Sequence, residues 1–188
     1  MKIGITGSIG CGKSVVMEYL RINGFKTYDA DKISYSLSQK GNVCYNMIID
    51  SFGEEILDDE KNINRQKLGY IIFNDKEKKK ELENIIHPYV RLEIENINDK
   101  LAFVEVPLLY EANMEDLFDS IIVVACDLDI QIARIMKRNG ISSEEAMKRI
   151  NNQKPLNEKI AKADYVIYNN GNIEDVWKKI EKILKGVM

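Results

Sequence analysis

The chain has 188 residues, of which 45% are hydrophobic and 30% are charged, a composition typical of one globular domain with a sizeable core. Its formal net charge of −3 gives no support to nucleic-acid binding, which usually needs a basic surface, and its apolar runs are too short for a signal peptide or a membrane span. Three cysteines without C-x-x-C spacing indicate reduced thiols, so we expect a cytoplasmic protein without disulfides or zinc.

The first stretch combines a short apolar strand with a phosphate-binding loop. Residues 1–14 read MKIGITGSIGCGKS, a full match to G-x-x-x-x-G-K-[ST], and the apolar spacing that follows predicts a helix ending near Gly24. Glycines in such a P-loop let successive backbone N–H groups converge on phosphate oxygens, and the helix adds its positive end. Lys13 is placed to reach the β- and γ-phosphates of a nucleotide, and the Ser14 hydroxyl to ligate Mg²⁺.

The predicted nucleotide contacts in this stretch are Gly10, Cys11, Gly12, Lys13, Ser14 and Val15. The Cys11 thiol is expected among the N–H groups that bind phosphate, an environment that should lower its pKa and make it reactive.

Two carboxylates follow the second predicted strand, residues 25–28. Asp29 and Asp31 come just past a strand end, where open α/β sheets bind their ligands. Either one could accept the proton of an attacking hydroxyl or help to hold a metal ion. Alternatively, one of them caps a helix that starts near Lys32. The spacing leaves these roles open.

Residues 33–98 show helical periodicity without a convincing strand, which predicts a helical insertion between the second and third strands. His87, the only histidine, precedes Pro88, a position biased away from helix. Its titratable side chain suits a contact to phosphate or hydroxyl, or it is a structural histidine whose hydrogen bonds are satisfied.

The sheet resumes at residues 101–106 and 120–126. Glu105 falls at a strand end, where P-loop enzymes carry an acidic residue that supports Mg²⁺ through water; the alternative is a simple edge carboxylate. Asp127 or Asp129 is expected to cap a helix that carries Arg134 and Arg138 on one face. Arginines in this region could clamp phosphoryl oxygens or form surface ion pairs.

Residues 164–168 predict a fifth strand, and residues 173–184 a final helix with Trp177 in the core. Strands that alternate with helices imply an α/β fold of the P-loop NTPase type, with three layers and a five-stranded parallel sheet. We expect a core of residues 1–35, 99–130 and 161–188. A helical substrate-binding insertion would span about 36–98, and a helical lid about 131–160.

The order of the motifs resembles the dephospho-CoA kinase family over essentially the whole chain. The matching stretches are GITGSIGCGKS, DADKI at 29–33, IIHP at 85–88, VPLLYE at 106–111, the spaced Arg134 and Arg138, Arg149 with Gln153, and ADYVIYNNG at 163–171. The resemblance implies that ATP, with Mg²⁺, phosphorylates the ribose 3′-hydroxyl of dephospho-CoA, the last step of coenzyme A synthesis. It implies no nucleic-acid, membrane or obligate protein partner.

The same resemblance implies roles for individual residues. Asp31 would be the base that accepts the 3′-hydroxyl proton, Arg134 would lie at the phosphate site and Arg138 in the lid. His87, Pro88 and Leu109 would contact the pantetheine-bearing substrate, and Asn170 and Gly171 would lie beside adenine. The chain departs from the family pattern at Val15, where Thr is usual, and at Cys11, where Ser is common.

Two other functions fit part of the sequence. Another small-molecule P-loop kinase, acting on a nucleoside monophosphate or on gluconate, would share Asp31 and the lid arginines but differ in the insertion. A GTPase switch is disfavoured, because the D-x-x-G match at residues 50–53 lies in a helical stretch and no N-K-x-D follows.

Overall fold

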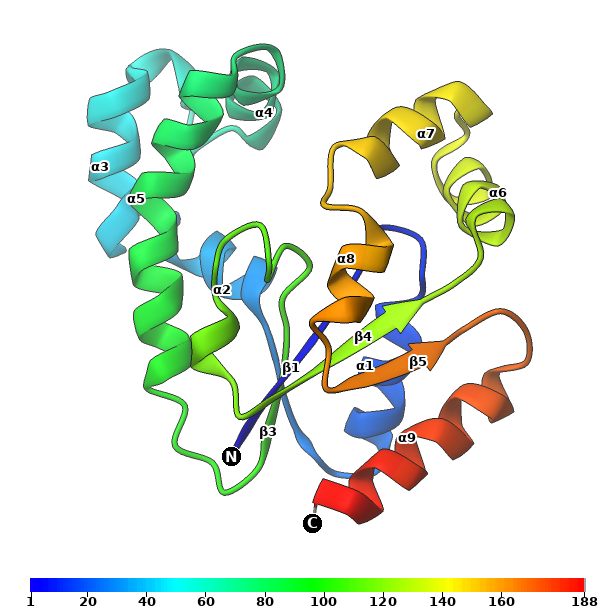
Figure 1. The fold of residues 1–188 in the computed structure, drawn as a ribbon. Helices are drawn as coiled ribbons and strands as arrows, with labels where there is room; N and C mark the ends of the chain where they lie inside the picture. The colour runs from blue at the N-terminus through cyan, green and yellow to red at the C-terminus, as the bar shows by residue number, and fades with distance from the viewer. Residues whose placement is uncertain (188) are drawn as a thin grey trace. The chain divides into compact units, whose positions relative to one another are not determined.

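The computed structural model describes residues 1–187 and divides them into two compact units. Residues 1–29 and 98–187 form a sheet unit, and residues 30–97 form a helical unit. The sheet unit contains β1 (Lys2–Gly7), α1 (Lys13–Ile22), β2 (Lys26–Asp29), β3 (Ala102–Glu105), β4 (Ser120–Ala125), α6 (Leu128–Asn139), α7 (Ser143–Asn151), α8 (Leu156–Ala161), β5 (Tyr165–Tyr168) and α9 (Ile173–Val187) (Figure 1). The helical unit contains α2 (Ala30–Leu37), α3 (Val43–Phe52), α4 (Arg65–Asn74) and α5 (Lys76–Glu95).

The sheet has five parallel strands in the order β2-β3-β1-β4-β5. Its central strands are apolar almost throughout because both faces are covered: Ile3, Ile5 and Val124 are fully buried. Burial of each such side chain stabilises the fold by about 1.5–3 kcal/mol. The predicted α/β fold with a five-stranded parallel sheet is confirmed.

Helices α1 and α9 cover one face of the sheet with a shared apolar core. Trp177 of α9 is half-buried in this core, with its ring centroid 5.6 Å from that of Tyr19 on α1, so its predicted core position is confirmed. Leu109 and Phe118 approach Gly4 from the chain between β3 and β4: a Cβ at Gly4 would lie 2.9 Å from Leu109 Cδ1. A side chain at this position would require Leu109 or Phe118 to shift.

The register of the parallel strands fixes which residues meet at their carboxyl ends. Asp29 of β2 pairs with Glu105 of β3, which also pairs with Ile5 of β1. Gly7, where β1 ends and the P-loop begins, pairs with Val124 of β4. These ends therefore bring the P-loop, Glu105 and Asp29 to one edge of the sheet, the edge at which ligands bind in such folds.

The helical unit has its own core, built from α3 to α5. Cys44, Ile48 and Ile56 are fully buried in it. Asn64 and Asp75 cap α4 and α5, since each side chain accepts from two backbone N–H groups of the first turn. Each cap contributes about 1 kcal/mol.

Three expectations for this region are corrected. The unit begins at Ala30 rather than at residue 36, because α2 packs against α3 and α5. The helix expected to start near Lys32 begins at Ala30, so Asp31 lies inside its first turn and Asp29 is the residue that precedes it. His87 and Pro88 lie within α5, which continues through them; the hydrogen bonds of neighbouring turns outweigh the missing proline N–H, a cost of about 3 kcal/mol.

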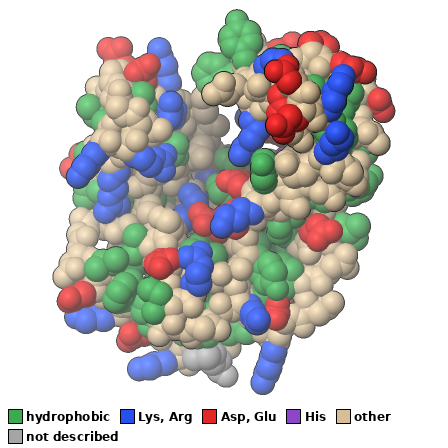
Figure 2. All heavy atoms as spheres, turned by 180° about the vertical axis from the view of Figure 1, so that it is seen from behind, with side chains coloured by type: hydrophobic (Ala, Val, Ile, Leu, Met, Phe, Trp, Pro, Cys, Tyr) green, Lys and Arg blue, Asp and Glu red, His purple; other side chains and the backbone are tan. Residues whose placement is uncertain are grey.

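Within residues 1–187, no helix combines the length and the apolar character needed to cross a membrane. On the face shown in Figure 2, lysine and arginine side chains are interspersed with aspartate and glutamate side chains. This mixture agrees with the small net charge of −3.

Candidate active site

The P-loop takes a conformation that requires its glycines. Gly7 has φ +146° and Gly12 has φ +87°, the second in the left-handed region that side chains disfavour. A Cβ at Gly7 would collide with the Val124 carbonyl oxygen, and one at Gly12 with Asn169 Nδ2. That same Asn169 amide donates to the Cys11 carbonyl at 2.9 Å. The loop is thus packed closely against β4 and the end of β5.

A cavity of about 270 Å³ opens beside this loop; we call it the P-loop cavity. It is lined by Gly10, Gly12, Lys13, Ser14, Glu105, Arg134 and Arg138. Every one of these residues was predicted from the sequence to bind nucleotide or metal. Three cationic side chains, a helix N-terminus and one carboxylate therefore surround a space suited to a phosphate chain and its metal ion.

The cations of the P-loop cavity are held differently. The Lys13 ammonium donates to the Gly7 and Ser8 carbonyls at 3.3 and 3.4 Å, and half-buried Arg134 donates to the Asn169 carbonyl at 2.9 Å. Arg138 is exposed, and its Nε donates to Asn139 Oδ1 at 3.2 Å. Arg134 is therefore held by a residue that follows β5, whereas Arg138 is exposed and bonds to its chain neighbour Asn139.

The Cys11 side chain is not where the sequence analysis expected it. It is fully buried in the core, with its Sγ 3.2 Å from the Sγ of buried Cys126. The hydrogen bond from Cys126 lowers the pKa of Cys11, and the charge of Lys13 acts in the same direction, while burial opposes both. Both cysteines and Cys44 are free. Cys11 can thus meet a nucleotide only through its backbone, because its thiol points into the core.

Several predicted nucleotide contacts do not line the P-loop cavity. Val15 is half-buried against the core. Asn170 and Gly171 lie at the surface after β5. The Asn170 side chain accepts from the Asp127 N–H at 2.9 Å, and Asp127 precedes α6 without making the predicted side-chain cap, so Asn170 ties the start of α6 to β5.

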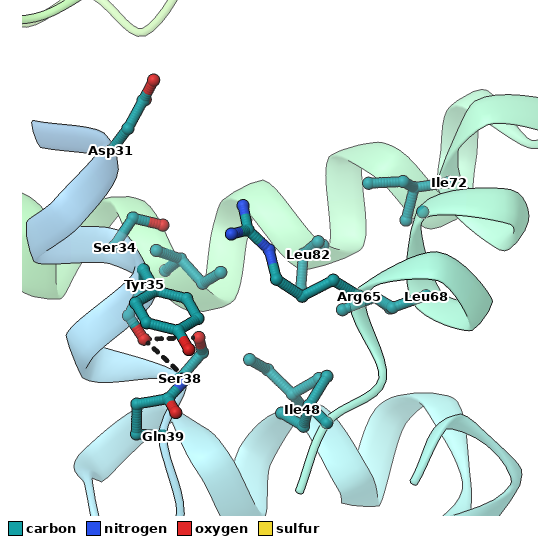
Figure 3. A pocket seen from close by; sticks show the side chains of 13 residues that line it. Asp31, Ser34, Tyr35, Ser38, Gln39, Ile48, Arg65, Leu68, Ile72 and Leu82 are labelled. Atoms are coloured by element: carbon teal, nitrogen blue, oxygen red, sulfur yellow. Dashed lines mark hydrogen bonds between the residues drawn. The ribbon is translucent and has the colours of Figure 1, made fainter. Parts of the chain in front are cut away.

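A second cavity, of about 420 Å³, lies within the helical unit; we call it the helical-unit cavity. Asp31, Ser34 and Tyr35 of α2 line one side of it, and Arg65 of α4 the other (Figure 3). The Arg65 guanidinium carbon lies 5.0 Å from the centroid of the Tyr35 ring, a cation–π distance. Its remaining lining residues are Ser38, Gln39, Ile48, Ile63, Leu68, Gly69, Ile72, Leu82 and Ile86.

The other predicted substrate contacts are not among the residues that line the helical-unit cavity. His87 and Pro88 belong to α5 but are absent from the lining. His87 is half-buried, and desolvation lowers its pKa, with Glu83 opposing and Lys79 assisting this shift. Leu109 is fully buried against Gly4. Because its side chain packs inside the sheet unit, it is not available to contact a substrate.

Sequence reasoning missed three residues that shape these cavities. Asn169 positions Arg134 and the Cys11 carbonyl, and buried Gln131 bonds to the P-loop. A polar residue in an otherwise apolar stripe of α6 was the available signal for Gln131. Arg65 follows the cap residue Asn64 at the start of α4, and nothing in its local pattern distinguishes it from a solvated helical arginine.

Comparison with known proteins adds independent findings. The family model described as dephospho-CoA kinase matches residues 1–175. A dephospho-CoA kinase from Fusobacterium nucleatum is 45% identical, over 100% of this chain and 98% of that protein. A solved dephospho-CoA kinase from Campylobacter jejuni is 35% identical with a TM-score of 0.72, and a solved Thermus thermophilus protein is 31% identical with a TM-score of 0.83. Each of these two similarities covers 100% of this chain and 98% of the solved chain.

The matches span both units and include the P-loop, the DAD stretch and the arginines of α6. On this full-length similarity and the geometry of its P-loop cavity, the chain belongs to the dephospho-CoA kinase family.

Proposed function

We propose that the protein transfers the γ-phosphoryl group of ATP to the 3′-hydroxyl of the ribose of dephospho-CoA, giving coenzyme A and ADP. The observation that carries this proposal is the convergence of Lys13, Ser14, Glu105, Arg134 and Arg138 on one cavity in a chain of this family. Phosphoryl transfer depends mainly on positioning and charge stabilisation, and these residues supply both.

The triphosphate of ATP would lie in the P-loop cavity. Backbone N–H groups from Gly10 to Ser14 and the start of α1 would bind its β-phosphate, and Lys13 would turn from the Gly7 and Ser8 carbonyls to the β- and γ-oxygens. Arg134, held by Asn169, is preorganised for a phosphate oxygen. Arg138, which is exposed, would close on the transferring group, where its planar fork matches the oxygens in the transition state.

The residues present fit a magnesium ion carried by the nucleotide. Ser14 and Glu105 line the same cavity, and residues 1–187 contain no group of three or more His, Cys, Asp or Glu that could hold a metal by themselves. This donor set suits Mg²⁺, which keeps several waters and binds through substrate phosphates. Ser14 would hold it directly and Glu105 through water, and when bound it would neutralise charge on the β- and γ-phosphates.

Asp31 is the proposed base. It lines the helical-unit cavity. It also lies two residues after Asp29, the last residue of β2, which pairs with Glu105. A carboxylate there can orient the ribose hydroxyl and accept its proton as the new P–O bond forms. Asp29 would shape the edge of the sheet near the metal ion.

The helical unit would bind the acceptor. The helical-unit cavity combines aliphatic side chains such as Ile48 and Leu68 with Arg65 and Tyr35, a surface that fits a long, partly apolar ligand with phosphate groups. Free thiols at Cys11, Cys44 and Cys126 support a reducing, cytoplasmic location. The net charge of −3 supports small-molecule substrates rather than nucleic acid.

A coupled assay of ADP release tests this function. The purified protein would be incubated with Mg-ATP and, separately, with dephospho-CoA, nucleoside monophosphates and gluconate. We expect ADP release with dephospho-CoA and loss of activity on chelation of Mg²⁺. ADP release only with a nucleoside monophosphate or with gluconate would reject the proposal in favour of another small-molecule kinase.

A further inference from the structure

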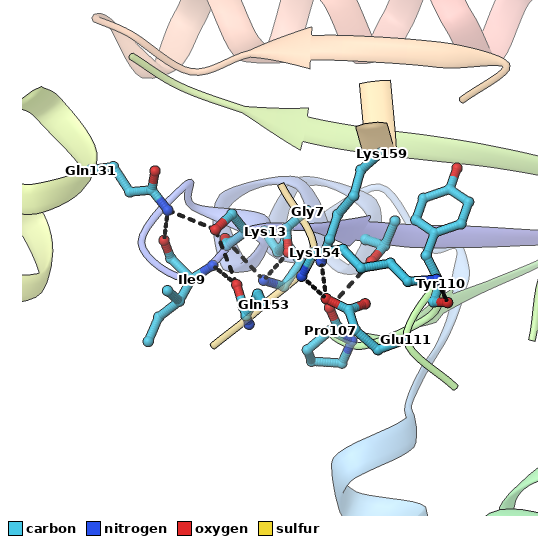
Figure 4. A network of polar contacts seen from close by, with 12 residues as sticks. Gly7, Ile9, Lys13, Pro107, Tyr110, Glu111, Gln131, Gln153, Lys154 and Lys159 are labelled. Atoms are coloured by element: carbon cyan, nitrogen blue, oxygen red, sulfur yellow. Dashed lines mark hydrogen bonds and ion pairs between the residues drawn. The ribbon is translucent and has the colours of Figure 1, made fainter. Parts of the chain in front are cut away.

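Two glutamine side chains, one from α6 and one that follows α7, form hydrogen bonds to Ser8 and Ile9 near the start of the P-loop. Gln131 of α6 donates through Nε2 to Ser8 Oγ at 2.7 Å and to the Ile9 carbonyl at 2.6 Å. Gln153, which follows α7, accepts through Oε1 from the Ile9 N–H at 2.8 Å and from the Ser8 hydroxyl at 3.0 Å. Ser8 and Gln131 are both 2% exposed. These four bonds, one of them buried and three part-buried, form a polar clamp on residues 8–9 (Figure 4).

The hydrogen bonds of the clamp allow only one orientation of each glutamine amide. The Ile9 N–H can only donate and the Ile9 carbonyl can only accept, so the orientation of each glutamine amide is determined. The Ser8 hydroxyl accepts from Gln131 and donates to Gln153, which links the two amides. The backbone that enters Gly10 therefore starts from a fixed point, and both polar backbone groups of Ile9 face the clamp.

The two glutamines also bracket the segment that carries the cavity arginines. Gln131 lies one turn before Arg134 and two turns before Arg138 on α6, and Gln153 follows the end of α7. Both ends of residues 131–153 are thus bonded to the same two residues of the P-loop. A displacement of the loop backbone would therefore displace the first turn of α6, the helix that carries the arginines.

Gln153 is itself held on a rigid support. The N–H of its neighbour Lys154 donates to Glu111 Oε1 at 2.9 Å, and the Lys154 ammonium to the Tyr110 carbonyl at 2.6 Å. The same Glu111 oxygen lies 2.7 Å from the ammonium of Lys159, whose side chain is fully buried. The ion pair between Glu111 and Lys159, also drawn in Figure 4, holds Glu111 in place, because removal of either partner would leave a buried charge unpaired. Glu111 in turn fixes the backbone at residue 154 through its hydrogen bond from the Lys154 N–H.

We propose that Gln131 and Gln153 are positioning residues for phosphoryl transfer, which hold Ser8 and Ile9 so that the amides from Gly10 to Ser14 are already arranged for a nucleotide phosphate. This inference rests on the proposed binding of ATP at the P-loop. It predicts that the clamp contributes to nucleotide affinity, because an unclamped loop must be ordered at the expense of binding.

The test is equilibrium binding of Mg-ADP and Mg-ATP by calorimetry, without acceptor. Gln153→Met keeps length and volume but removes both bonds, and we expect its dissociation constants to rise about tenfold, the scale of a buried hydrogen bond. Asp164→Ala is the control: it removes the hydrogen bond from the Ile121 N–H at the amino end of β4, away from the carboxyl edge of the sheet where the loop lies. It should lower the melting temperature but leave the dissociation constants within about twofold of wild type.

A second variant keeps the inference testable if Gln153→Met is poorly folded. Ser8→Ala removes the hydroxyl that joins the two amides, and its effect on nucleotide binding should be non-additive with that of Gln153→Met. Unchanged affinity in folded Gln153→Met and Ser8→Ala would overturn the positioning role alone, as would an equal loss of affinity in the Asp164→Ala control. Absence of nucleotide binding in the wild type would instead overturn the assignment of ATP to the P-loop, and the positioning role with it.

Discussion

The P-loop cavity is held by hydrogen bonds between segments far apart in the chain, whereas the helical-unit cavity is lined by helices that follow one another closely. Ser8 and Gln153 are 145 residues apart, and Cys11 and Asn169 are 158 apart, yet each pair is bonded. In the helical-unit cavity, Arg65 of α4 lies over the Tyr35 ring of α2, and both helices belong to the same small unit of residues 30–97. One cavity is fixed by the whole sheet unit and the other by a local helical assembly.

This difference indicates a division of labour. Phosphoryl transfer needs donors that do not reorganise during the reaction, and a loop bonded to β5, α6 and residue 153 meets that need. Acceptor recognition needs shape and a few polar groups, which a separate helical unit can supply without disturbing the loop. Changes in the P-loop cavity should therefore alter turnover, and changes in the helical-unit cavity should alter the KM for the acceptor.

The largest expected effect is an exception to this division, because a residue of the helical-unit cavity should alter turnover. Asp31 lines the helical-unit cavity but is the proposed base, so Asp31→Asn should lower kcat by about 100-fold or more, the usual scale for loss of a general base. The amide keeps the shape and one acceptor oxygen, so the KM values should change little. Steady-state kinetics at varied Mg-ATP and dephospho-CoA would measure both constants.

Asp29→Asn is the control for Asp31→Asn, since it neutralises the neighbouring carboxylate of the same DAD stretch. It should cost less in kcat and appear instead as a greater Mg²⁺ requirement or a lower melting temperature. Near wild-type turnover in Asp31→Asn, together with an inactive but folded Asp29→Asn, would reverse the assignment of the base.

The next effect sharpens the comparison within the P-loop cavity. Arg138→Lys keeps the charge but loses the two-pronged contact, so kcat should fall by about tenfold while the KM for dephospho-CoA stays constant. Arg149→Lys, at an exposed arginine of α7 outside the cavity lining, is the matched control and should be close to wild type. A change confined to the acceptor KM in Arg138→Lys would remove this residue from the phosphoryl-transfer role.

Much of the P-loop cavity could be predicted because residues close together in the sequence form a recognisable motif. The G-x-x-x-x-G-K-[ST] spacing identifies Lys13 and Ser14, and the alternation of strands and helices places Glu105 at the same sheet edge. The partners that hold the loop could not be predicted. Asn169 reaches the loop because it follows β5, which pairs with β4 next to β1, and Gln131 reaches it from α6. This is a consequence of tertiary structure that no local pattern contains.

The errors have the same origin. Cys11 was placed among the phosphate-binding groups from its position in the motif, but Gly10 and Gly12 turn the backbone so that its thiol enters the core beside Cys126. A residue before a proline, such as His87, is biased away from helix, yet α5, which is twenty residues long and capped by Asp75, includes both His87 and Pro88. In both cases, packing outweighed a local preference.

A smaller effect tests the role of the helical-unit cavity. Arg65→Met keeps the aliphatic stem and removes the charge beside Tyr35, so the KM for dephospho-CoA should rise by about tenfold, the scale of one charged hydrogen bond, while the dissociation constant for Mg-ATP stays unchanged. Arg91→Met is the matched control, because Arg91 pairs with Glu95 on α5 and is absent from the lining. A loss of Mg-ATP affinity in Arg65→Met would contradict the division between the two cavities.

The smallest effect concerns His87, and it separates a structural histidine from a substrate contact. Burial lowers the pKa of His87 from its ordinary value of 6.5, with the Lys79 charge adding to the shift and Glu83 opposing it. Below about pH 6.5 the unfolded chain therefore takes up a proton at this residue that the folded chain resists. Folding stability is lost at His87 as pH falls through that range and is fully kept above it.

His87→Gln removes the only histidine of the chain, so its melting temperature should fall less steeply than that of the wild type between pH 7.5 and 5.5, a window chosen around the ordinary pKa of about 6.5. Thermal melting of both proteins across this range measures the difference. At pH 7.5, where His87 is neutral in both states, the variant should keep its KM for dephospho-CoA within about twofold. A rise of about tenfold in that KM, with an unchanged slope of melting temperature against pH, would instead place His87 against the acceptor and extend the substrate site beyond the helical-unit cavity.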